Sequence, residues 1–385
     1  MNLKLFFSPL EESLFKHIGS SNCFYKSIHS NIDKMPDIKG AELAIIGVPE
    51  ERGTTVNEGT AKGPDQIRKK LYDLKKGSGS YRIVDLGNLR PGHNLDETHG
   101  RLKEVCRFLL ERNILPVILG GSHDLDLAQF TAYEDLEKLI TMLNVDAFLD
   151  MEEHAAELQK SHVHKIMVHE PNFLFHYSHL AYQSYLVDNN IPQVLEMLYF
   201  ESHRLGELRH NFKEMEPVIR QADMLSFDVS AIRSSDAPGN ARSQPFGLTG
   251  EEACQICWYA GLNEKLSSAG FYEYNPSLDD GQMKTAAVCA TMIWYFIEGF
   301  YHRKNEHVFK QNDYLKYTVS MPSSPATITF YKSKLSDKWW LEIPVTHPSL
   351  RYERTIIVPC SHSDYNTAAK GEVPDRYIHA QAKMA

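Results

Sequence analysis

Three apolar runs of the sequence each lead into side chains that can bind a metal ion. The runs are Leu115 to Leu119, Met224 to Phe227 and the stretch Thr141 to Asp150. The candidate ligands that follow or end them are His123, Asp146, Asp150 and Asp228. Hard divalent cations prefer carboxylate oxygens and borderline cations accept imidazole, so one histidine and three aspartates make a suitable ligand set. The sequence therefore predicts a metal site built from these four residues.

Buried strands of a parallel sheet are the elements expected to bring these ligands together. An apolar run suits such a strand, and α/β proteins place their ligand sites at the carboxyl ends of these strands. Apolar side chains recur at helical spacing between residues 102 and 110, which predicts a helix packed on the sheet. The strand Leu115 to Leu119 follows within a few residues. Strand, helix and strand in this succession predict an α/β fold with a parallel sheet.

The other elements expected in this region continue the alternation. Predicted strands are Glu42 to Val48, Ile83 to Leu86 and Gly270 to Tyr274, and predicted helices are Ala128 to Leu139, Val194 to Glu207, Phe212 to Gln221, Glu251 to Leu262 and Thr285 to Phe300. Thr249 is the expected N-cap of the helix at Glu251. The segment after Asp150 is rich in histidine, and we expect a long loop with short elements there. Its histidines either lie at the surface or a subunit contact, or line the cleft.

The sequence pattern divides the chain into three parts. Residues 1–40 are expected to form an N-terminal arm, with some helix around Leu10 to Ile18. Residues 41–302 form the predicted α/β domain. Residues 303–385 form a β-rich C-terminal extension that ends in a polar tail from about Ser363.

Composition and charge exclude several classes of partner. Of the 385 residues, 42% are hydrophobic and 24% are charged, as in ordinary globular domains. A net charge of -9 gives no support to nucleic-acid binding. The longest apolar segment, Ala286 to Ile297, is too short to span a bilayer, and the first residues lack the pattern of a secretory signal. The six cysteines are scattered, which favours reduced thiols, so we expect a cytoplasmic protein that binds neither nucleic acid nor membrane.

The motifs along residues 40 to 302 resemble, in their order, those of the arginase and ureohydrolase superfamily. The matching segments are G-V-P-E-E-R-G and G-T-A-K-G-P-D-Q-I-R (Gly47 to Arg68), G-G-S-H (Gly120 to His123), D-A-F-L-D (Asp146 to Asp150), S-F-D-V-S (Ser226 to Ser230), G-L-T-G-E-E (Gly247 to Glu252) and E-Y-N-P-S-L-D (Glu273 to Asp279). The loops, and Y-F-I-E-G-F-Y at the end of the last helix, are most similar to formimidoylglutamase-like members.

The resemblance implies a fold, a reaction and a set of partners. The implied fold is a three-layer α/β/α sandwich with a parallel sheet and a two-manganese site at the strand ends. Members hydrolyse a C–N bond of a guanidine or amidine and often form homo-oligomers. The implied ligand is therefore a small cationic amidine or guanidine. Glu273 matches the family carboxylate that pairs with this cation, although a structural hydrogen bond could also account for it.

Two departures from the family motifs fall on the same metal ion. Phe148 stands where D-A-H-x-D has its histidine, and Ser230 stands where S-x-D-x-D has its last aspartate. In the family pattern these two residues serve only the second metal, whereas the four candidate ligands named above are retained. We therefore expect Mn²⁺ as cofactor, with one ion rather than two. Two cations together lower the pKa of the attacking water, so turnover should fall with one.

Three hypotheses remain open from the sequence. The first is a one-metal hydrolase of an amidine or guanidine, formimidoylglutamase-like. The second is a catalytically degenerate homologue that serves as a binding or scaffold protein, with residues 303–385 as its interaction module. The third is a second metal site rebuilt from Glu152, Glu153 or His154. No catalytic residue is assigned, because the family's proton-shuttle histidine cannot be aligned with this sequence; His154 and His162 are candidates for it.

Overall fold

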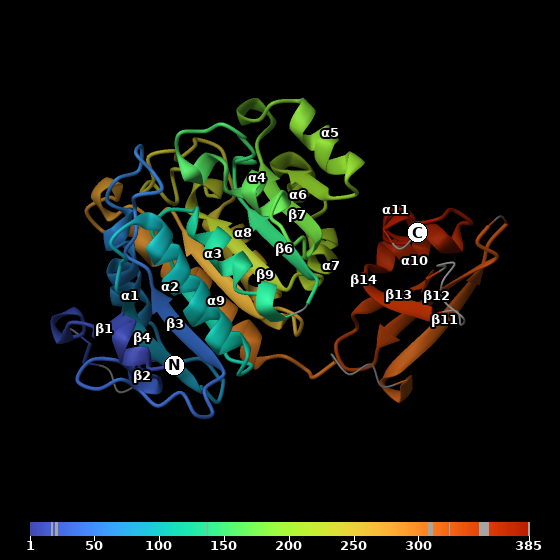
Figure 1. The fold of residues 1–385 in the computed structure, drawn as a ribbon. Helices are drawn as coiled ribbons and strands as arrows, with labels where there is room; N and C mark the ends of the chain where they lie inside the picture. Colours follow the sequence, from blue (N-terminus) through green and yellow to red (C-terminus); the bar gives the residue numbers. More distant parts are fainter. Residues whose placement is uncertain are drawn as a thin grey trace.

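The computed structural model describes residues 1–16, 18–19, 22–136, 138–306, 311–322, 324–345 and 354–383. A ten-stranded sheet with the order β1-β4-β3-β5-β10-β9-β6-β7-β8, and with β2 also paired to β4, forms the centre of the larger part (Figure 1). All of its pairings are parallel except that of β1 with β4. A separate four-stranded antiparallel sheet follows near the C-terminus. The predicted α/β class with a β-rich C-terminal extension is confirmed.

The strands of the large sheet are short and almost wholly buried in its middle. They are β1 (Phe7–Ser8), β2 (His29–Ser30), β3 (Leu43–Gly47), β4 (Ile83–Leu89), β5 (Leu115–Leu119), β6 (Ile140–Val145), β7 (Leu174–Tyr182), β8 (Glu201–Arg204), β9 (Met224–Asp228) and β10 (Ser268–Tyr272). The α-helices of this part are α1 (Gly63–Asp73), α2 (Leu95–Leu110), α3 (Leu125–Thr131), α4 (His162–Met167), α5 (Asn190–Met197), α6 (Leu205–His210), α7 (Met215–Arg220), α8 (Gly250–Leu262) and α9 (Lys284–Tyr301).

Helices cover both faces of the large sheet, which explains why its strands are apolar throughout. Along β3, Leu43 and Ile45 belong to the core shared with α1, α8 and α9, whereas Ala44 and Ile46 belong to the core shared with α2 and α3. The two helix layers lie on opposite sides of the sheet in Figure 1. Each buried aliphatic side chain contributes about 1.5–3 kcal/mol. Thr249 caps α8 in a capping box with Glu252, so the predicted N-cap is confirmed.

Several predicted elements differ from those in the structure. The histidine-rich segment is not mainly loop, because it contains β7, whose polar residues are buried with partners. His179 Nδ1 lies 2.8 Å from Tyr177 Oη and its Nε2 lies 3.0 Å from Asp146 O. The predicted helix Val194 to Glu207 is interrupted by β8, and the helix expected at Ala128 to Leu139 ends at Thr131 in α3. The described part of the N-terminal arm has strands and 3-10 turns but no α-helix.

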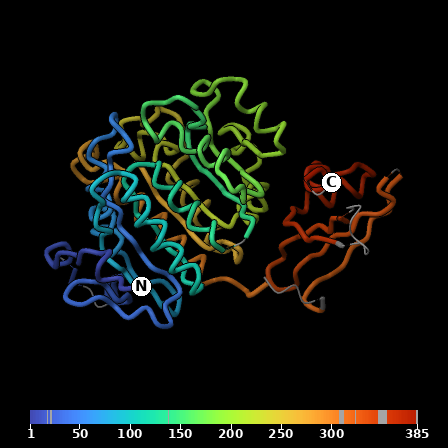
Figure 2. The backbone as a smooth tube through the Cα atoms, viewed as in Figure 1, coloured from blue at the N-terminus to red at the C-terminus, as the bar shows by residue number. Residues whose placement is uncertain are grey.

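The C-terminal extension is a small sheet covered by two helices. Its elements are β11 (Tyr314–Ser320), β12 (Thr327–Ser333), β13 (Trp339–Val345), β14 (Arg354–Cys360), α10 (His362–Ala369) and α11 (Asp375–Ala382). The expected polar tail is thus wrong, because Tyr377 of α11 packs with Phe330 and Leu341 in a small core. Figure 2 shows this sheet beside the larger one. Among the described residues, no helix is both long and apolar enough to cross a membrane.

Arg220, at the end of α7, joins the extension to the larger part. Its Nη2 donates to Trp339 O at 3.0 Å and to Cys360 O at 3.2 Å. The guanidinium carbon also lies 4.4 Å from the centroid of the Trp340 ring. These contacts fix the small sheet against the end of α7. Because α7 leads into the start of β9, the contacts lie opposite the carboxyl ends of the strands.

Candidate metal centre

Four neighbouring strands bring most of the predicted site residues to one edge of the large sheet. In the order β5-β10-β9-β6, the strand ends carry His123, Glu273, Asp228 and Asp146 respectively. The turn after β5 is tight, since a Cβ on Gly121 would lie 1.8 Å from Glu50 O. The carboxyl ends of parallel strands meet at one edge, which is where α/β sheets bind ligands.

Three buried atoms with free lone pairs face one another at the centre of this edge. His123 Nδ1 lies 3.3 Å from Asp146 Oδ2 and 3.2 Å from Asp228 Oδ2. None of these three atoms has a hydrogen-bond partner among the described residues. Burying such groups unpartnered is costly, and ligand atoms about 2.0–2.2 Å from one cation have this mutual spacing. The arrangement fits one divalent ion.

Asp126, on α3, holds two imidazoles with their free nitrogens turned toward the centre. Ser226 Oγ donates to Asp126 Oδ2 at 2.9 Å, so it accepts from His123 Nε2 at 2.8 Å. His162 Nδ1 lies 2.8 Å from Asp126 Oδ1. In the neutral imidazoles this leaves His123 Nδ1 and His162 Nε2 without protons. Metal-binding histidines are oriented in the same way, by a carboxylate on the other ring nitrogen.

Asp150 and His162 extend the set of possible ligands. One ligand atom from each of His123, Asp146, Asp150 and His162 lies within 4.8 Å of the others. His162 Nε2 is buried, has no hydrogen-bond partner in the described ranges, and lies 3.7 Å from Asp150 Oδ2. Asp150 adopts a left-handed backbone with φ 44°, a conformation that side-chain-bearing residues rarely adopt and that often marks a functional site.

The outer oxygens of the same aspartates are already occupied by donors of the protein. Asp146 Oδ1 accepts from Phe148 N at 3.0 Å and from Ser230 Oγ at 2.7 Å. Asp228 Oδ1 accepts from Ser230 N at 2.6 Å. In both aspartates Oδ2 faces His123, and Oδ1 is the oxygen that accepts these bonds. Together with the loss of two ligands, these bonds do not fit the second ion that the family resemblance implies.

Arg242 lies over the position where that second ion's histidine would stand. Its guanidinium carbon is 3.5 Å from the centroid of the Phe148 ring, and its Nη2 donates to Asp150 Oδ1 at 3.1 Å. Burial alone would raise the pKa of Asp150, but the charge of Arg242 holds it well below the usual value. Burial and the charges of Asp228 and Asp150 raise the pKa of Asp146 to about 7. The carboxylates therefore crowd one another, except where a cation stands beside them.

Glu273, the predicted substrate contact, is buried and has both carboxylate oxygens engaged. Oε1 accepts from His123 N at 2.8 Å and Oε2 accepts from Asn57 Nδ2 at 2.6 Å. Like Asp150, it has a left-handed backbone, with φ 67°. Burial and the charge of Asp228 raise its pKa to about 8. In this structure the carboxylate supports His123 and the neighbouring loops.

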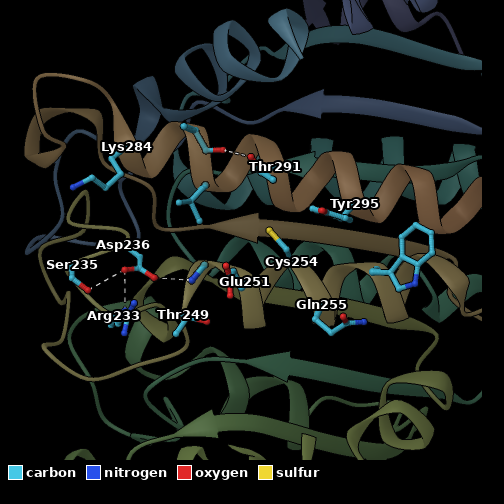
Figure 3. Close-up of a pocket in the computed structure, with 14 residues that line it drawn as sticks. Arg233, Ser235, Asp236, Thr249, Glu251, Cys254, Gln255, Lys284, Thr291 and Tyr295 are labelled. Carbon is cyan, nitrogen blue, oxygen red and sulfur yellow. Dashed lines mark hydrogen bonds and ion pairs between the residues drawn. The ribbon is translucent and has the colours of Figure 1, made fainter. Parts of the chain in front are cut away.

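The loop between β9 and α8 carries both Ser230 and Arg242, and Asp236 anchors it. Asp236 Oδ2 accepts from Gly250 N, at the start of α8, and its Oδ1 accepts from Arg233 Nε, both at 2.9 Å. An aspartate at this end of a helix is favoured by the helix dipole. Figure 3 shows the anchor beside a groove of about 1080 Å³ lined by α8, α9 and this loop. The groove contains none of the candidate metal ligands.

Three functional side chains escaped the sequence reasoning in whole or in part. Asp126 stands three residues after His123, which lies in the turn before α3, and that closeness in sequence is the signal for it. The sequence marks His162 as a candidate proton shuttle but not as a ligand. Arg242 lies in a loop 92 positions beyond its partner Asp150, and no motif identifies it.

The residues proposed to rebuild a second site do not reach the centre. Glu152, Glu153 and His154 all have exposed side chains. The side chain of His154 is 89% exposed, and its ion-pair contact is with Glu153 at 3.8 Å. The third hypothesis from the sequence therefore has no support in the geometry.

Comparisons with known proteins agree on one family. The Arginase family model matches residues 41–298. The formimidoylglutamase of Staphylococcus epidermidis is 22% identical over 276 residues, which cover 69% of this chain and 88% of that protein. Formiminoglutamase of Trypanosoma cruzi, solved with Mn²⁺, superposes with a TM-score of 0.65 at 23% identity, covering 69% of this chain and 96% of the other. Formimidoylglutamase of Bacillus subtilis gives a TM-score of 0.67 at 18% identity, covering 77% and 97%.

Proposed function

Because the chain belongs to the arginase family, we propose that it is a metal-dependent hydrolase of the C–N bond in a linear amidine or guanidine, formimidoylglutamase-like, that uses one Mn²⁺. The observation that carries the proposal is the inward-facing set of His123 Nδ1, Asp146 Oδ2 and Asp228 Oδ2. All three atoms are buried and have no hydrogen-bond partner in the part of the chain that the structure describes. These are hard or borderline donors, and their types suit manganese.

The proposed ligands are His123, Asp146, Asp150 and Asp228, with His162 as a further donor. When bound, the ion would supply a Lewis acid that lowers the pKa of a water molecule. The residues of the chain do the rest. Asp126 keeps both histidines in the tautomer that presents a lone pair to the centre. Ser230 holds Asp146 by its outer oxygen, so the inner oxygen stays directed at the ion.

Glu273 is the proposed contact for a cationic substrate. Its Oε2 shares a hydrogen bond with Asn57 Nδ2, so an amidinium would have to replace or join that donor. An amidinium would bring a positive charge to the carboxylate, which the neutral Asn57 amide does not, and this favours the exchange. The bond from His123 N to Oε1 would keep the carboxylate beside the metal centre while the other oxygen turns to the substrate.

The direct test combines metal content with product release. Elemental analysis after manganese loading is expected to give one ion per chain, and none in Asp150→Ala, because the variant loses a ligand and the charge it supplies. The loaded protein is then offered a panel of linear amidines and guanidines, and urea or formamide is measured. The proposal fails if neither product is released from any of them.

A second function has one observation in its favour. With both oxygens of Glu273 engaged inside the protein, the structure also suits a catalytically degenerate homologue that keeps one ion and acts as a binding or scaffold protein. In that case residues 303–385 would be the interaction module. Turnover that Asp228→Ala abolishes would exclude this alternative.

The cellular location, oligomeric state and domain roles of the protein are proposed from the same family membership. We expect a cytoplasmic homo-oligomer in which residues 41–302 form the catalytic domain, residues 1–40 an arm and residues 303–385 an extension. All six cysteines are free thiols, as expected in a reducing compartment. Sedimentation velocity would measure the oligomeric state.

A further inference from the structure

The Arg242 side chain makes two contacts that fix a positive charge at the mouth of the metal centre. Its Nη2 lies 3.1 Å and its Nη1 3.5 Å from the two oxygens of Asp150, and its guanidinium carbon lies 3.5 Å from the centroid of the Phe148 ring. The side chain is only 15% exposed. We propose that this guanidinium takes the place of a second metal ion, so that the centre pairs one divalent ion with one built-in organic cation. The inference rests on the proposed function for the first ion.

Charge balance supports this replacement. The family motifs D-A-H-x-D and S-x-D-x-D together hold four aspartates, whose charge of four matches that of two divalent ions. Here Ser230 removes one aspartate, and three remain: Asp146, Asp150 and Asp228. One divalent ion leaves one negative charge over, and the guanidinium of Arg242 neutralises it. A second divalent ion in place of Arg242 would leave an excess positive charge in a buried site.

Phenylalanine at position 148, in place of the family's histidine, provides a ring on which a guanidinium can stack. A phenyl ring offers its negative face to a cation, and arginine stacks well on such a face. An imidazole at the same position would bind a metal ion but would compete with the guanidinium for Asp150. The N–H of Phe148 and the hydroxyl of Ser230 meanwhile occupy the outer oxygen of Asp146. The Phe148 ring thus supports Arg242, and the Ser230 hydroxyl occupies an oxygen of Asp146.

The consequence for chemistry is a division of labour between the two cations. A guanidinium supplies charge and N–H donors but has no coordination position for water. Arg242 would thus hold Asp150 in place and cover the outer side of the centre. Activation of water would fall to the single metal ion.

The test compares two variants that differ only at position 242. The first, Phe148→His with Ser230→Asp, restores the ligands of the family pattern and keeps Arg242. The second adds Arg242→Met, which keeps a long side chain without charge. After manganese loading and desalting, elemental analysis should give one ion per chain in the first variant and two in the second. The electron paramagnetic resonance spectrum should change from that of an isolated Mn²⁺ to that of an exchange-coupled pair.

Two results would overturn the inference. Two ions in the variant that keeps Arg242 would show that its guanidinium does not hold the second cation's place. One ion in the variant with Arg242→Met would show that something other than Arg242 excludes the second ion. Arg107→Met added to the first variant is the control, because Arg107 is paired with Glu111 and Asp135 on the surface of α2. It should leave the ion count at one.

A single substitution protects the test against misfolding of the multiple variants. In Arg242→Met alone, one uncompensated negative charge remains beside the ion, so the Kd for Mn²⁺ should fall at least about tenfold. An unchanged or higher Kd would contradict the inference. Ion counts and spectra require no turnover. A protein that binds one ion beside Arg242 but releases no product would therefore defeat the proposed function and leave this inference standing.

Discussion

Two buried arginine–aspartate pairs in this protein have different surroundings. Arg68 is fully buried, and its Nε lies 2.8 Å and its Nη2 3.0 Å from the two oxygens of Asp85. Its remaining N–H groups donate to Gly87 O and Asn88 Oδ1, among others. Asp85 also accepts from Gly87 N and from the Tyr72 hydroxyl. Every polar atom of the pair is satisfied, as a buried ion pair requires.

Arg242 and Asp150 form a pair with fewer partners in a more open place. Arg242 rests on an aromatic ring, and within the described part of the chain its ion pair is with Asp150. Asp150 in turn faces His162 Nε2, which has no hydrogen-bond partner among the residues that the structure describes. The Arg68 guanidinium is thus part of the fold, whereas we propose that the Arg242 guanidinium balances charge at a metal site. Substitutions should separate these roles.

The largest effect is expected from Arg68→Met. Removing the guanidinium leaves Asp85 buried and charged, so the free energy of unfolding should fall by about 3–5 kcal/mol. Urea unfolding followed by circular dichroism measures it. The loss should be the same with saturating Mn²⁺ and with EDTA. A loss below about 1 kcal/mol, or one that manganese reverses, would contradict the structural role.

A smaller effect is expected from Asp126→Asn, which tests the carboxylate behind both histidines. An asparagine cannot accept from both Ser226 and His162 as the carboxylate does, so the imidazoles lose their fixed orientation. The affinity for Mn²⁺ should fall about 10–100-fold, measured by isothermal titration calorimetry. Asp124→Asn is the matched control, because Asp124 pairs with His99 and not with the ligand histidines. Equal losses in both variants would point to general destabilisation.

The loss of unfolding free energy in Arg242→Met should depend on whether Mn²⁺ is present. With EDTA, Asp150 is left buried with an unpaired charge, so the free energy of unfolding should fall by about 1–2 kcal/mol. With saturating Mn²⁺ the ion pairs Asp150, and the loss should be below about 0.5 kcal/mol. Urea unfolding with EDTA and with saturating Mn²⁺ measures the two losses. If manganese leaves the loss unchanged, Arg242 is a structural residue like Arg68.

The smallest effect is expected from Arg107→Gln on the surface of α2. Arg107 pairs with Glu111 at 2.9 Å and Asp135 at 2.7 Å, but all three side chains are at least 40% exposed. Water screens such pairs, so the free energy of unfolding, measured by urea unfolding, should change by no more than about 0.5 kcal/mol. A larger change would mean that geometry alone, without burial, decides the value of an arginine pair in this protein.

The sequence predicted the central strands because they are buried on both faces and so appear as unbroken apolar runs. Leu115–Leu119 and Met224–Asp228 lie where expected. The prediction failed at β7, where Ser178 and His179 are buried with hydrogen-bond partners that a single sequence does not reveal. It failed again at the C-terminus, where α11 is stabilised by packing on the small sheet and not by a strong pattern of its own.

Some residues of the candidate site were predictable from the sequence and others were not. The residues at strand ends were predictable, because position relative to an apolar run identifies them, and the structure brings His123, Asp146 and Asp228 together. Asp126 and Arg242 were not, since their roles depend on contacts between distant segments. The engagement of both oxygens of Glu273 also depends on loop contacts, from Asn57 in particular.

The hydrogen bond from Ser230 Oγ to Asp146 Oδ1 has an evolutionary consequence. Ser230→Asp alone would break this bond and add a like charge beside Asp146. Phe148→His alone would replace the phenyl face beneath Arg242 with an imidazole, which repels the guanidinium when protonated. Each single substitution toward a two-ion centre is therefore expected to lower stability before any gain in metal binding. A return to two ions would need several substitutions made together.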